Sequence, residues 1–237
     1  MIRTYRRILL KISGEILRGE ASESFDEAIL ERLATETKEI VDAGLELMIV
    51  VGGGNIFRHS THAHHDMDRV TADYMGMLAT IINGLALQSA FEHVGLKTRV
   101  MSAIRAEQVV EPYIRRRAIR HVEKGRVVVL VAGTGNPYFT TDSAAVLRAS
   151  ELGCDILLKG TKVDGIYTHD PKKDPTAERF NALSCTEVIE RKLHVMDLTA
   201  FTMARDNQLP ILVFDILTPG NAVRAAKGES IGTLVQP

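Results

Sequence analysis

The stretch Val127–Asp142 reads VVVLVAGTGNPYFTTD, and its pattern predicts the fold of the chain. Its first residues, Val127–Ala132, are all apolar, a run typical of a strand buried on both faces and far too short to span a membrane. The polar segment that follows leads into a helical pattern that starts at Asp142 and is ended by Gly153. A buried strand, a polar loop and a helix in this order are typical of a parallel sheet covered by helices.

Other short runs rich in Val, Ile and Leu predict further buried strands. They are Ile8–Ile12, Leu45–Val51, Thr98–Met101, Ile156–Leu158 and Ile211–Phe214. Helical patterns lie between these runs. The first follows a capping box of Ser24 and Glu27 and ends at Gly44, and the others cover Met67–Val94, Pro112–Lys124 and Asp142–Leu152. Because strands and helices alternate, we expect an α/β fold with a mostly parallel central sheet between helix layers.

The alternating pattern runs through the whole chain without a linker, a repeat or a low-complexity tract. We therefore expect residues 1–237 to form a single domain. An N-terminal lobe of about residues 1–153 and a C-terminal lobe of about residues 154–237 would share its sheet. In such a sheet, ligands bind beyond the carboxyl ends of the strands.

The charges of the chain nearly cancel. Its 237 residues include 29 Lys and Arg against 30 Asp and Glu, a formal net charge of −1. We therefore expect neither nucleic acid nor an anionic membrane as a partner. The basic run Arg115–Arg117 with Arg120 falls in a helical pattern with few aromatic residues, which favours a solvated or subunit-facing surface over a nucleic-acid site.

The two cysteines and the N-terminus indicate the compartment. Cys154 and Cys185 lie far apart without a CxxC pattern, so they predict no zinc site and fit a reducing environment. The apolar stretch Ile8–Leu10 is cut short by Lys11 and is too short for the core of a signal peptide. We expect a cytoplasmic protein.

Two of the predicted strands end in sequences suited to phosphate. KISGE, at Lys11–Glu15, offers a lysine that can neutralise a phosphate and backbone N–H groups that can bind its oxygens. GGGN, at Gly52–Asn55, lets the backbone approach a ligand closely, and Arg58 can fork onto phosphate oxygens. The alternatives are an edge lysine before a turn and a purely structural glycine run.

Two further strand ends carry polar and aromatic groups. In GTGNPYFTTD, at Gly133–Asp142, the amide and the threonines can hydrogen-bond a small anion or a nucleotide while an aromatic residue lies against a ring. N-capping by Thr141 and Asp142 is an alternative role compatible with the first. In KGTKVDGIYTHDP, at Lys159–Pro171, the Asp-Gly turn predicts a small hairpin that could hold a second, larger ligand. Neither GxxxxGK[ST] nor GxGxxG occurs in these segments.

These motifs, together with MDRVTADYMGMLAT at 67–80, RRRAIRHVEKGR at 115–126 and IGTLV at 231–235, resemble in order those of the bacterial uridylate kinases of the amino acid kinase superfamily. The resemblance runs from Arg6 to Val235. It implies transfer of the γ-phosphoryl group of MgATP to UMP, giving UDP and ADP for pyrimidine nucleotide synthesis, by in-line transfer without a covalent intermediate. It also implies that the N-terminal lobe holds the acceptor and the subunit contacts and the C-terminal lobe holds ATP.

The resemblance implies roles for individual residues. On the ATP side are Lys11, Ile12, Ser13, Gly14, Gly54, Arg58, Thr161, Tyr167 and Asp170. On the UMP side are Gly53, Asp73, Thr134, Gly135, Asn136, Pro137, Tyr138, Phe139, Thr140 and Thr141. Lys11, Asp142 and Lys159 would serve catalysis, with Asp142 orienting Lys11 and the helix N-terminus. We favour Lys159 over Lys162 as the second cation because it ends its predicted strand. Mg²⁺ would enter with ATP, without a protein ligand.

Two segments depart from the family pattern. Gly19–Asp26 lacks the inner glycines that related chains associate with activation by GTP, so we expect weak or absent activation. The histidines His59, His62, His64 and His65 match no zinc motif, which favours a solvated loop over a metal site. UTP is expected to inhibit, because it can occupy the UMP site.

The sequence also leads to an expected assembly and leaves two alternative functions open. The apolar face of Met75–Leu87, taken with the resemblance, predicts a homohexamer built from dimers. One alternative function is a kinase of the same superfamily that acts on a carboxylate or carbamate. The other is a non-enzymatic nucleotide-binding or oxyanion storage protein on the same fold.

Overall fold

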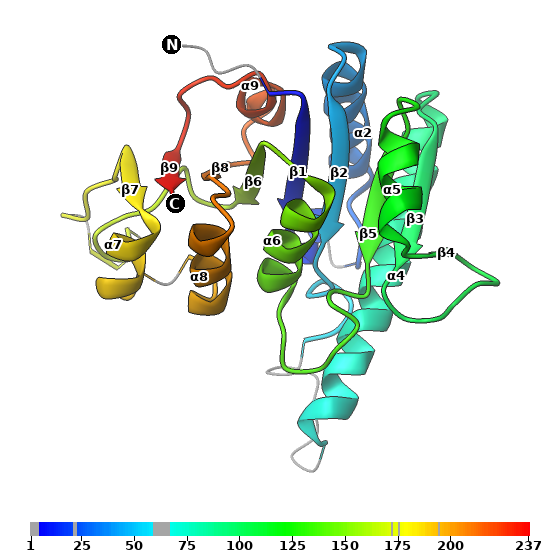
Figure 1. The fold of residues 1–237 in the computed structure, drawn as a ribbon, viewed down its shortest axis with the longest axis horizontal. Coiled ribbons are helices and arrows are strands. Elements are labelled where there is room, and N and C mark those ends of the chain that lie inside the picture. Colours follow the sequence, from blue (N-terminus) through cyan, green and yellow to red (C-terminus); the bar gives the residue numbers. More distant parts are fainter. Residues whose placement is uncertain (1–4, 21–22, 59–66, 172, 175, 194) are drawn as a thin grey trace.

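The structure is a computed structural model that describes residues 5–20, 23–58, 67–171, 173–174, 176–193 and 195–237. Strands in these residues form one sheet, in the order β4-β3-β5-β2-β1-β6-β8-β9-β7 (Figure 1). Their bounds are β1 Arg7–Ile12, β2 Glu46–Val51, β3 Thr98–Ser102, β4 Glu111–Pro112, β5 Val127–Val131, β6 Ile156–Thr161, β7 Ala182–Ser184, β8 Ile211–Asp215 and β9 Thr233–Gln236. Neighbouring strands are parallel except β8 and β9, which are antiparallel.

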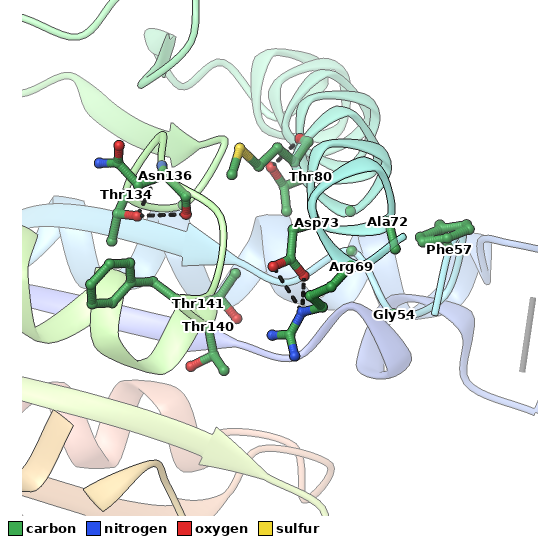
Figure 2. Close-up of a pocket in the computed structure, with 15 residues that line it drawn as sticks. Gly54, Phe57, Arg69, Ala72, Asp73, Thr80, Thr134, Asn136, Thr140 and Thr141 are labelled. Carbon is green, nitrogen blue, oxygen red and sulfur yellow. Dashed lines mark hydrogen bonds and ion pairs between the residues drawn. The ribbon is translucent and has the colours of Figure 1, made fainter. Parts of the chain in front are cut away.

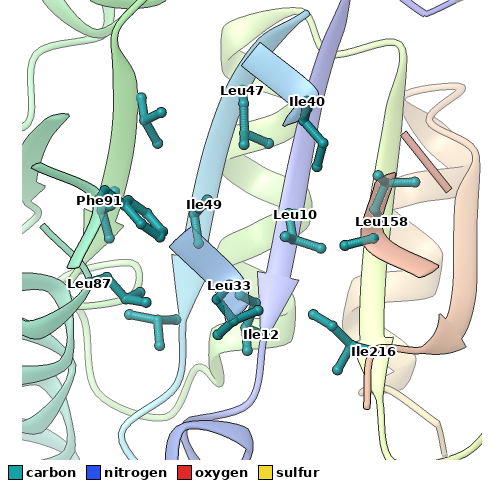
Figure 3. Close-up of a cluster of buried hydrophobic side chains, with 14 of the residues drawn as sticks. Leu10, Ile12, Leu33, Ile40, Leu47, Ile49, Leu87, Phe91, Leu158 and Ile216 are labelled. Atoms are coloured by element: carbon teal, nitrogen blue, oxygen red, sulfur yellow. The ribbon is translucent and has the colours of Figure 1, made fainter. Parts of the chain in front are cut away.

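Helices cover both faces of the sheet. They are α1 Gly14–Arg18, α2 Glu27–Asp42, α4 Arg69–His93, α5 Arg115–Val122, α6 Thr141–Leu152, α7 Cys185–Glu190, α8 Leu198–Asp206 and α9 Asn221–Ala226. One buried cluster joins the sheet to α1, α2, α4 and α9 (Figure 3), and a second joins it to α5, α6, α7 and α8. The prediction of a mostly parallel sheet between helix layers is confirmed.

The side chains of β1 show why the apolar runs form strands. Alternate residues of a strand point to opposite faces. Leu10 and Ile12 belong to the cluster under α2, whereas Leu9 belongs to the cluster under α6. All three are almost fully buried, so each removes apolar surface from water, at roughly 25 cal/mol per Å². Lys11 shares the face of Leu9, and this places its side chain on the α6 side of the sheet.

All the predicted buried strands are observed, but the structure differs from the prediction in three respects. The strand predicted at Ile156–Leu158 continues to Thr161 as β6. The short strands β4, β7 and β9 were not predicted. The hairpin predicted at the Asp164–Gly165 turn is wrong: Tyr167 forms an isolated antiparallel bridge with Arg179 instead.

Three predicted helix starts are corrected by their hydrogen bonds. Asp26, not Ser24, caps α2, because its carboxylate accepts from the backbone N–H of Ile29. Thr140, not Thr141 or Asp142, caps α6, since its hydroxyl accepts from two backbone N–H groups of the first turn. The helix predicted from Pro112 begins at Arg115, because Pro112 pairs with β3 as part of β4.

The long helix α4 is a core helix. By length and composition it is the one helix among the described residues that could cross a membrane. It packs against α2 and against β2, β3 and β5, and Leu87 and Phe91 are completely buried. A Cβ at Gly84 would lie 2.5 Å from the side chain of Val131, so the helix lies directly on the sheet. Its first turns extend beyond the carboxyl ends of the strands (Figure 1).

Candidate active site

Three polar loops meet at the carboxyl edge of the sheet. They follow β1, β2 and β5, which are neighbours in the order β5-β2-β1. The backbone N–H of Gly52 donates to the carbonyl of Ile12, which ties the GGGN loop to the end of β1. A Cβ at Gly14 would lie 2.6 Å from the carbonyl oxygen of Gly52 and 2.5 Å from Oδ1 of Asn55. The two loops therefore touch through their backbones, and only glycine fits at position 14.

We expect Gly14→Ala to destabilise the protein and to weaken nucleotide binding. Its methyl group meets backbone atoms that cannot move without displacing both loops, so a loss of about 1–3 kcal/mol is expected. Chemical denaturation measures the free energy of unfolding. For stability, the matched control is Gly76→Ala in α4, where a Cβ has open space and the higher helix propensity of alanine favours folding by up to about 1 kcal/mol. Equal stability of the two variants would contradict the contact.

Lys11 and Lys159 lie side by side under the first turn of α6. They are register partners on the parallel strands β1 and β6, and both are 7% exposed. Asp142 lies between their ammonium groups, with Oδ1 2.7 Å from Nζ of Lys11 and Oδ2 2.7 Å from Nζ of Lys159. One carboxylate therefore holds two buried cations at the edge of the sheet.

The pKa values in this cluster reflect burial and mutual charge. Burial raises the pKa of Asp142, but the charges of Lys11 and Lys159 outweigh it and the net pKa is lowered. Burial and the neighbouring charge of Lys11 lower the pKa of Lys159 to about 8, against the opposing effect of Asp142. The cluster thus keeps its carboxylate ionised, and Lys159, with a pKa of about 8, stays mostly charged at neutral pH.

Asp197, just before α8, contacts the start of α6, the helix that carries Asp142. It accepts hydrogen bonds from the hydroxyl groups of Thr140 and Ser143. Its charge also raises the pKa of Lys159. Asp197 thereby links α8 to the start of α6, where Asp142 lies. The sequence pattern gave no signal for this role.

A cavity of about 200 Å³ has Thr141, the residue before Asp142, in its lining. Figure 2 shows the residues that line it. The predicted UMP-site residues that line it are Gly53, Asp73, Thr134, Asn136, Phe139, Thr140 and Thr141. Gly54, predicted on the ATP side, also lines it. Gly135, Pro137 and Tyr138 do not, and the side chain of Tyr138 is exposed. The structure thus brings together most of the predicted acceptor residues.

One face of α4 supplies much of the rest of the lining. Beyond Asp73, this face contributes Arg69, Ala72, Gly76, Met77 and Thr80, which sequence reasoning missed along with Phe57. Gly133, the first residue of the predicted GTGNPYFTTD segment, also lines the cavity. The helical spacing of the α4 residues within MDRVTADYMGMLAT is a signal that could have found them. Thr80 also accepts from the backbone N–H of Ala132 at 2.7 Å, which anchors the start of the β5–α6 loop on α4.

A cluster of charges lies beside the KISGE segment. Glu15 pairs with Arg58, and its Oε2 is 3.9 Å from Nζ of Lys162. Arg58 lies against the backbone at Gly54, within reach of a ligand bound there. Lys162 is about half exposed on the outer side, whereas Lys159 lies inside β6, two residues before its end. The two lysines therefore occupy different environments.

A second cavity, of about 490 Å³, lies beyond β6. Tyr167 and Asp170 line it together with Arg191 and Lys192, but Thr161 does not. The hydroxyl of Thr161 is used locally, where it hydrogen-bonds both the carbonyl and the N–H of Val163. Two of the three residues predicted for the adenosine end thus share one cavity. The predicted histidine loop at 59–65 lies outside the described residues.

The chain matches the Amino acid kinase family over residues 6–215, most of its length. It belongs to that family. A uridylate kinase from Salinibacter ruber is 55% identical over 231 residues, which cover 98% of this chain and 89% of the relative. The structure is similar to that of a UMP kinase from Bacillus anthracis, with a TM-score of 0.95 at 41% identity, covering 99% of this chain and 97% of the other. A UMP kinase from Ureaplasma parvum gives a TM-score of 0.93 at 39% identity, with both chains fully covered.

The site of this amino acid kinase family member has two cavities with a cationic cluster between them. The first lies at the ends of β2 and β5, and the second is lined by the segment after β6. Lys11 on β1 and Lys159 on β6 lie between the two in the order of the sheet. Such an arrangement can hold two ligands and neutralise an anionic group that passes between them.

Proposed function

We propose that this chain is a UMP kinase that transfers the γ-phosphoryl group of ATP to UMP, giving UDP and ADP. The observation that carries the proposal is the Lys11–Asp142–Lys159 cluster, in which Asp142 directly follows Thr141 of the cavity lining. The high identity to a uridylate kinase over nearly the full chain supports it. We further propose that the acceptor site belongs to the lobe up to about residue 153 and the ATP site to the lobe that follows.

Catalysis rests on alignment and on charge. Phosphoryl transfer spreads negative charge over the oxygens of the transferring group, and fixed cations stabilise it. Lys11 is held by Asp142 before the reaction begins, so little reorganisation is needed. Lys159 supplies the second charge because it shares Asp142 with Lys11, whereas Lys162 lies near Glu15. Asp142 acts as the common counterion that fixes the position of both ammonium groups.

The donor set around the cluster fits a metal that arrives with ATP. Both oxygens of Asp142 lie 2.7 Å from a lysine nitrogen. The described part of the chain holds no group of three or more His, Cys, Asp and Glu side chains that could bind a metal. Mg²⁺ would therefore be held by phosphate oxygens and water rather than by the protein. When bound, it supplies positive charge to the phosphate chain.

The acceptor cavity offers a contact for each part of UMP. Asp73 is an ionic acceptor for ribose hydroxyls, and Thr134 with Asn136 can hydrogen-bond the edge of the base. Phe139 provides an aromatic face. Thr141 adjoins the cluster and can donate to the phosphate, whereas the hydroxyl of Thr140 already donates to Asp197. UTP fits the same contacts, so we propose that it inhibits.

On the donor side, ATP would run along the edge towards β6. The backbone of Ile12–Gly14 and Arg58 would bind its phosphates, and Tyr167 with Asp170 would hold the adenosine end. Thr161 would act there through its backbone, because its side chain is engaged with Val163. Activation by GTP is expected to be weak or absent. A several-fold rate increase with GTP at subsaturating ATP would contradict that.

The surface of α4 supports the proposed homohexamer. Tyr74, Met75, Leu78 and Ile82 are between 37% and 52% exposed although they are large and apolar. Their spacing places them along one side of the helix, away from the buried side. Contiguous exposed apolar surface is typical of subunit contacts. Light scattering that gives a monomer would contradict the assembly.

The arginines of α5 stay outside the proposed site. Arg115, Arg116, Arg117 and Arg120 are exposed, and Arg115 hydrogen-bonds the carbonyl of Glu151 in α6. We propose a cytoplasmic enzyme without a nucleic-acid or membrane partner.

The pKa of Lys159 predicts the pH profile. The charged ammonium is the form that binds phosphate, so kcat/KM for ATP is expected to fall as the pH rises above about 8. Bound phosphates favour the charged form, so kcat should hold to higher pH than kcat/KM. In Lys159→Arg, whose guanidinium stays charged, the decline should disappear from the accessible range. An unchanged profile in Lys159→Arg would contradict the assignment.

A coupled assay of ADP release tests the function. UMP, CMP, dUMP and acetylglutamate are each offered with MgATP at equal concentration. We expect UMP to be turned over fastest by a wide margin. Preferred turnover of acetylglutamate would indicate a carboxylate kinase, and nucleotide binding without any turnover would indicate a storage protein. Either result would overturn the proposal.

A further inference from the structure

An ion pair between Arg69 and Asp73 lies in the lining of the acceptor cavity. Arg69 is the first residue of α4, and Asp73 lies one turn later. Nε of Arg69 is 2.8 Å from Oδ1 and 2.8 Å from Oδ2 of Asp73. Both residues line the cavity, and Figure 2 shows the carboxylate and the guanidinium facing each other. The side chain of Asp73 is 18% exposed and that of Arg69 is 50% exposed, so the carboxylate is largely shielded from water while the guanidinium is half in solvent.

A second donor reaches the same carboxylate from across the cavity. The backbone N–H of Tyr138 donates to Oδ2 of Asp73 at 2.7 Å. Tyr138 has a φ of 72°, a conformation uncommon for a residue with a side chain, so the loop is held in this position against a local cost. The guanidinium of Arg69 lies 5.5 Å from the centre of the Tyr138 ring. Arg69, Asp73 and Tyr138 thus join α4 to the β5–α6 loop.

These contacts fix the orientation of Asp73. An ionised carboxylate has about four acceptor positions, which can receive several donors at once. Arg69 approaches both oxygens symmetrically and Tyr138 takes one further position on Oδ2. The positions that remain can receive hydroxyl groups of a ribose. Two adjacent hydroxyls demand a carboxylate held at a fixed rotation, whereas the single hydroxyl of a 2′-deoxyribose tolerates a loose one.

We propose that Arg69 is a positioning residue that acts through Asp73 to set the preference for ribonucleotide over deoxyribonucleotide acceptors. This inference rests on the proposed function. A direct contact of Arg69 with the acceptor phosphate is the competing role. The two differ in their consequence, because UMP and dUMP carry the same phosphate and differ only in the sugar.

The test compares UMP and dUMP in Arg69→Gln. We expect kcat/KM for UMP to fall by roughly tenfold or more, the effect of one charge-assisted hydrogen bond, and kcat/KM for dUMP to change little. KM for UMP should carry most of the change, and KM for ATP should stay as in the wild type. The matched control is Lys38→Gln, which removes a similar ion pair, with Asp42, from the surface of α2. Lys38→Gln should change neither kcat/KM for UMP nor kcat/KM for dUMP.

A double-mutant cycle separates the two roles. In an Asp73→Asn background, Arg69→Gln should have no further effect on the UMP to dUMP ratio, because Arg69 acts through Asp73. Equal losses for UMP and dUMP, no loss for either, or a further loss in the Asp73→Asn background would each overturn the inference. Wild-type protein that fails to convert UMP would instead overturn the proposed function, so the two failures are distinguishable.

Discussion

Lys11→Ala is expected to lower kcat by at least about two orders of magnitude while the protein stays folded. Lys11 provides a buried cation that Asp142 holds at 2.7 Å, and Asp142 directly follows Thr141 of the acceptor cavity. Without it, the negative charge that develops on the transferring group faces Lys159 alone. The fold should survive because Asp142 keeps its second ion pair, with Lys159 at 2.7 Å, so no buried charge is left without a partner.

The measurement is steady-state turnover of UMP by Lys11→Ala, with circular dichroism and thermal melting to establish folding. KM for UMP should change less than kcat, because the missing interaction is strongest in the transition state. Lys11→Arg is the matched control, since it keeps the charge while changing its geometry, and it should fall between alanine and the wild type. A near-normal rate from well-folded Lys11→Ala would refute the role of Lys11.

Asp142→Asn should damage both activity and stability. Two buried ammonium groups on adjacent strands would lose the carboxylate that both of them contact. Removing one partner of a buried ion pair costs about 3–5 kcal/mol, because the remaining charge is uncompensated. The pKa of Lys159 is already lowered to about 8 by burial and by Lys11, and it should fall further without Asp142. Lys159 would then be neutral at the pH of the assay.

Denaturant titration and a pH profile of turnover test this variant. We expect a clear loss of unfolding free energy, a drop in kcat of about two orders of magnitude and a decline that begins at lower pH than in the wild type. Asp42→Asn is the control, since Asp42 pairs with Lys38 on the exposed surface of α2, where an ion pair contributes little. Wild-type stability and rate in Asp142→Asn would contradict the role of the cluster.

The long buried strands could be predicted from local sequence. A strand covered by helices on both faces is apolar at every position, as β5 is from Val127 to Val131. The missed strands are too short to carry such a pattern, since β4 has two residues and β7 has three. They form because the neighbouring strand offers free backbone groups, and that information lies elsewhere in the chain.

The wrong hairpin shows how a local signal is overridden. Asp164–Gly165 is a strong turn signal, but the carboxylate of Asp164 accepts from the hydroxyl of Tyr167 and from the guanidinium of Arg179. Those side-chain contacts, and the bridge between Tyr167 and Arg179, replace the expected pairing. Arg179 lies 15 residues after Asp164, outside the turn segment, so the turn signal itself does not contain that contact.

The candidate site also has features that local sequence predicts and features that it does not. The loops with their glycines, threonines and lysines could be found from residue types at strand ends. The pairing of Lys11 with Lys159 could not, because it requires β1 and β6 to be neighbours in the sheet. The bridging position of Asp142 follows from that pairing and from α6 lying over it. Arg69 was overlooked although its spacing from Asp73 is readable in the sequence.

The stereochemistry of transfer at phosphorus tests the central claim most directly. That claim is direct passage of the phosphoryl group from ATP to UMP across the Lys11–Asp142–Lys159 cluster. ATP made chiral at its γ-phosphorus with oxygen isotopes and sulfur is used as donor, and the configuration of the β-phosphorus of the UDP product is determined. One in-line displacement predicts inversion of configuration. Retention would require two displacements through a covalent intermediate, and it would contradict the account.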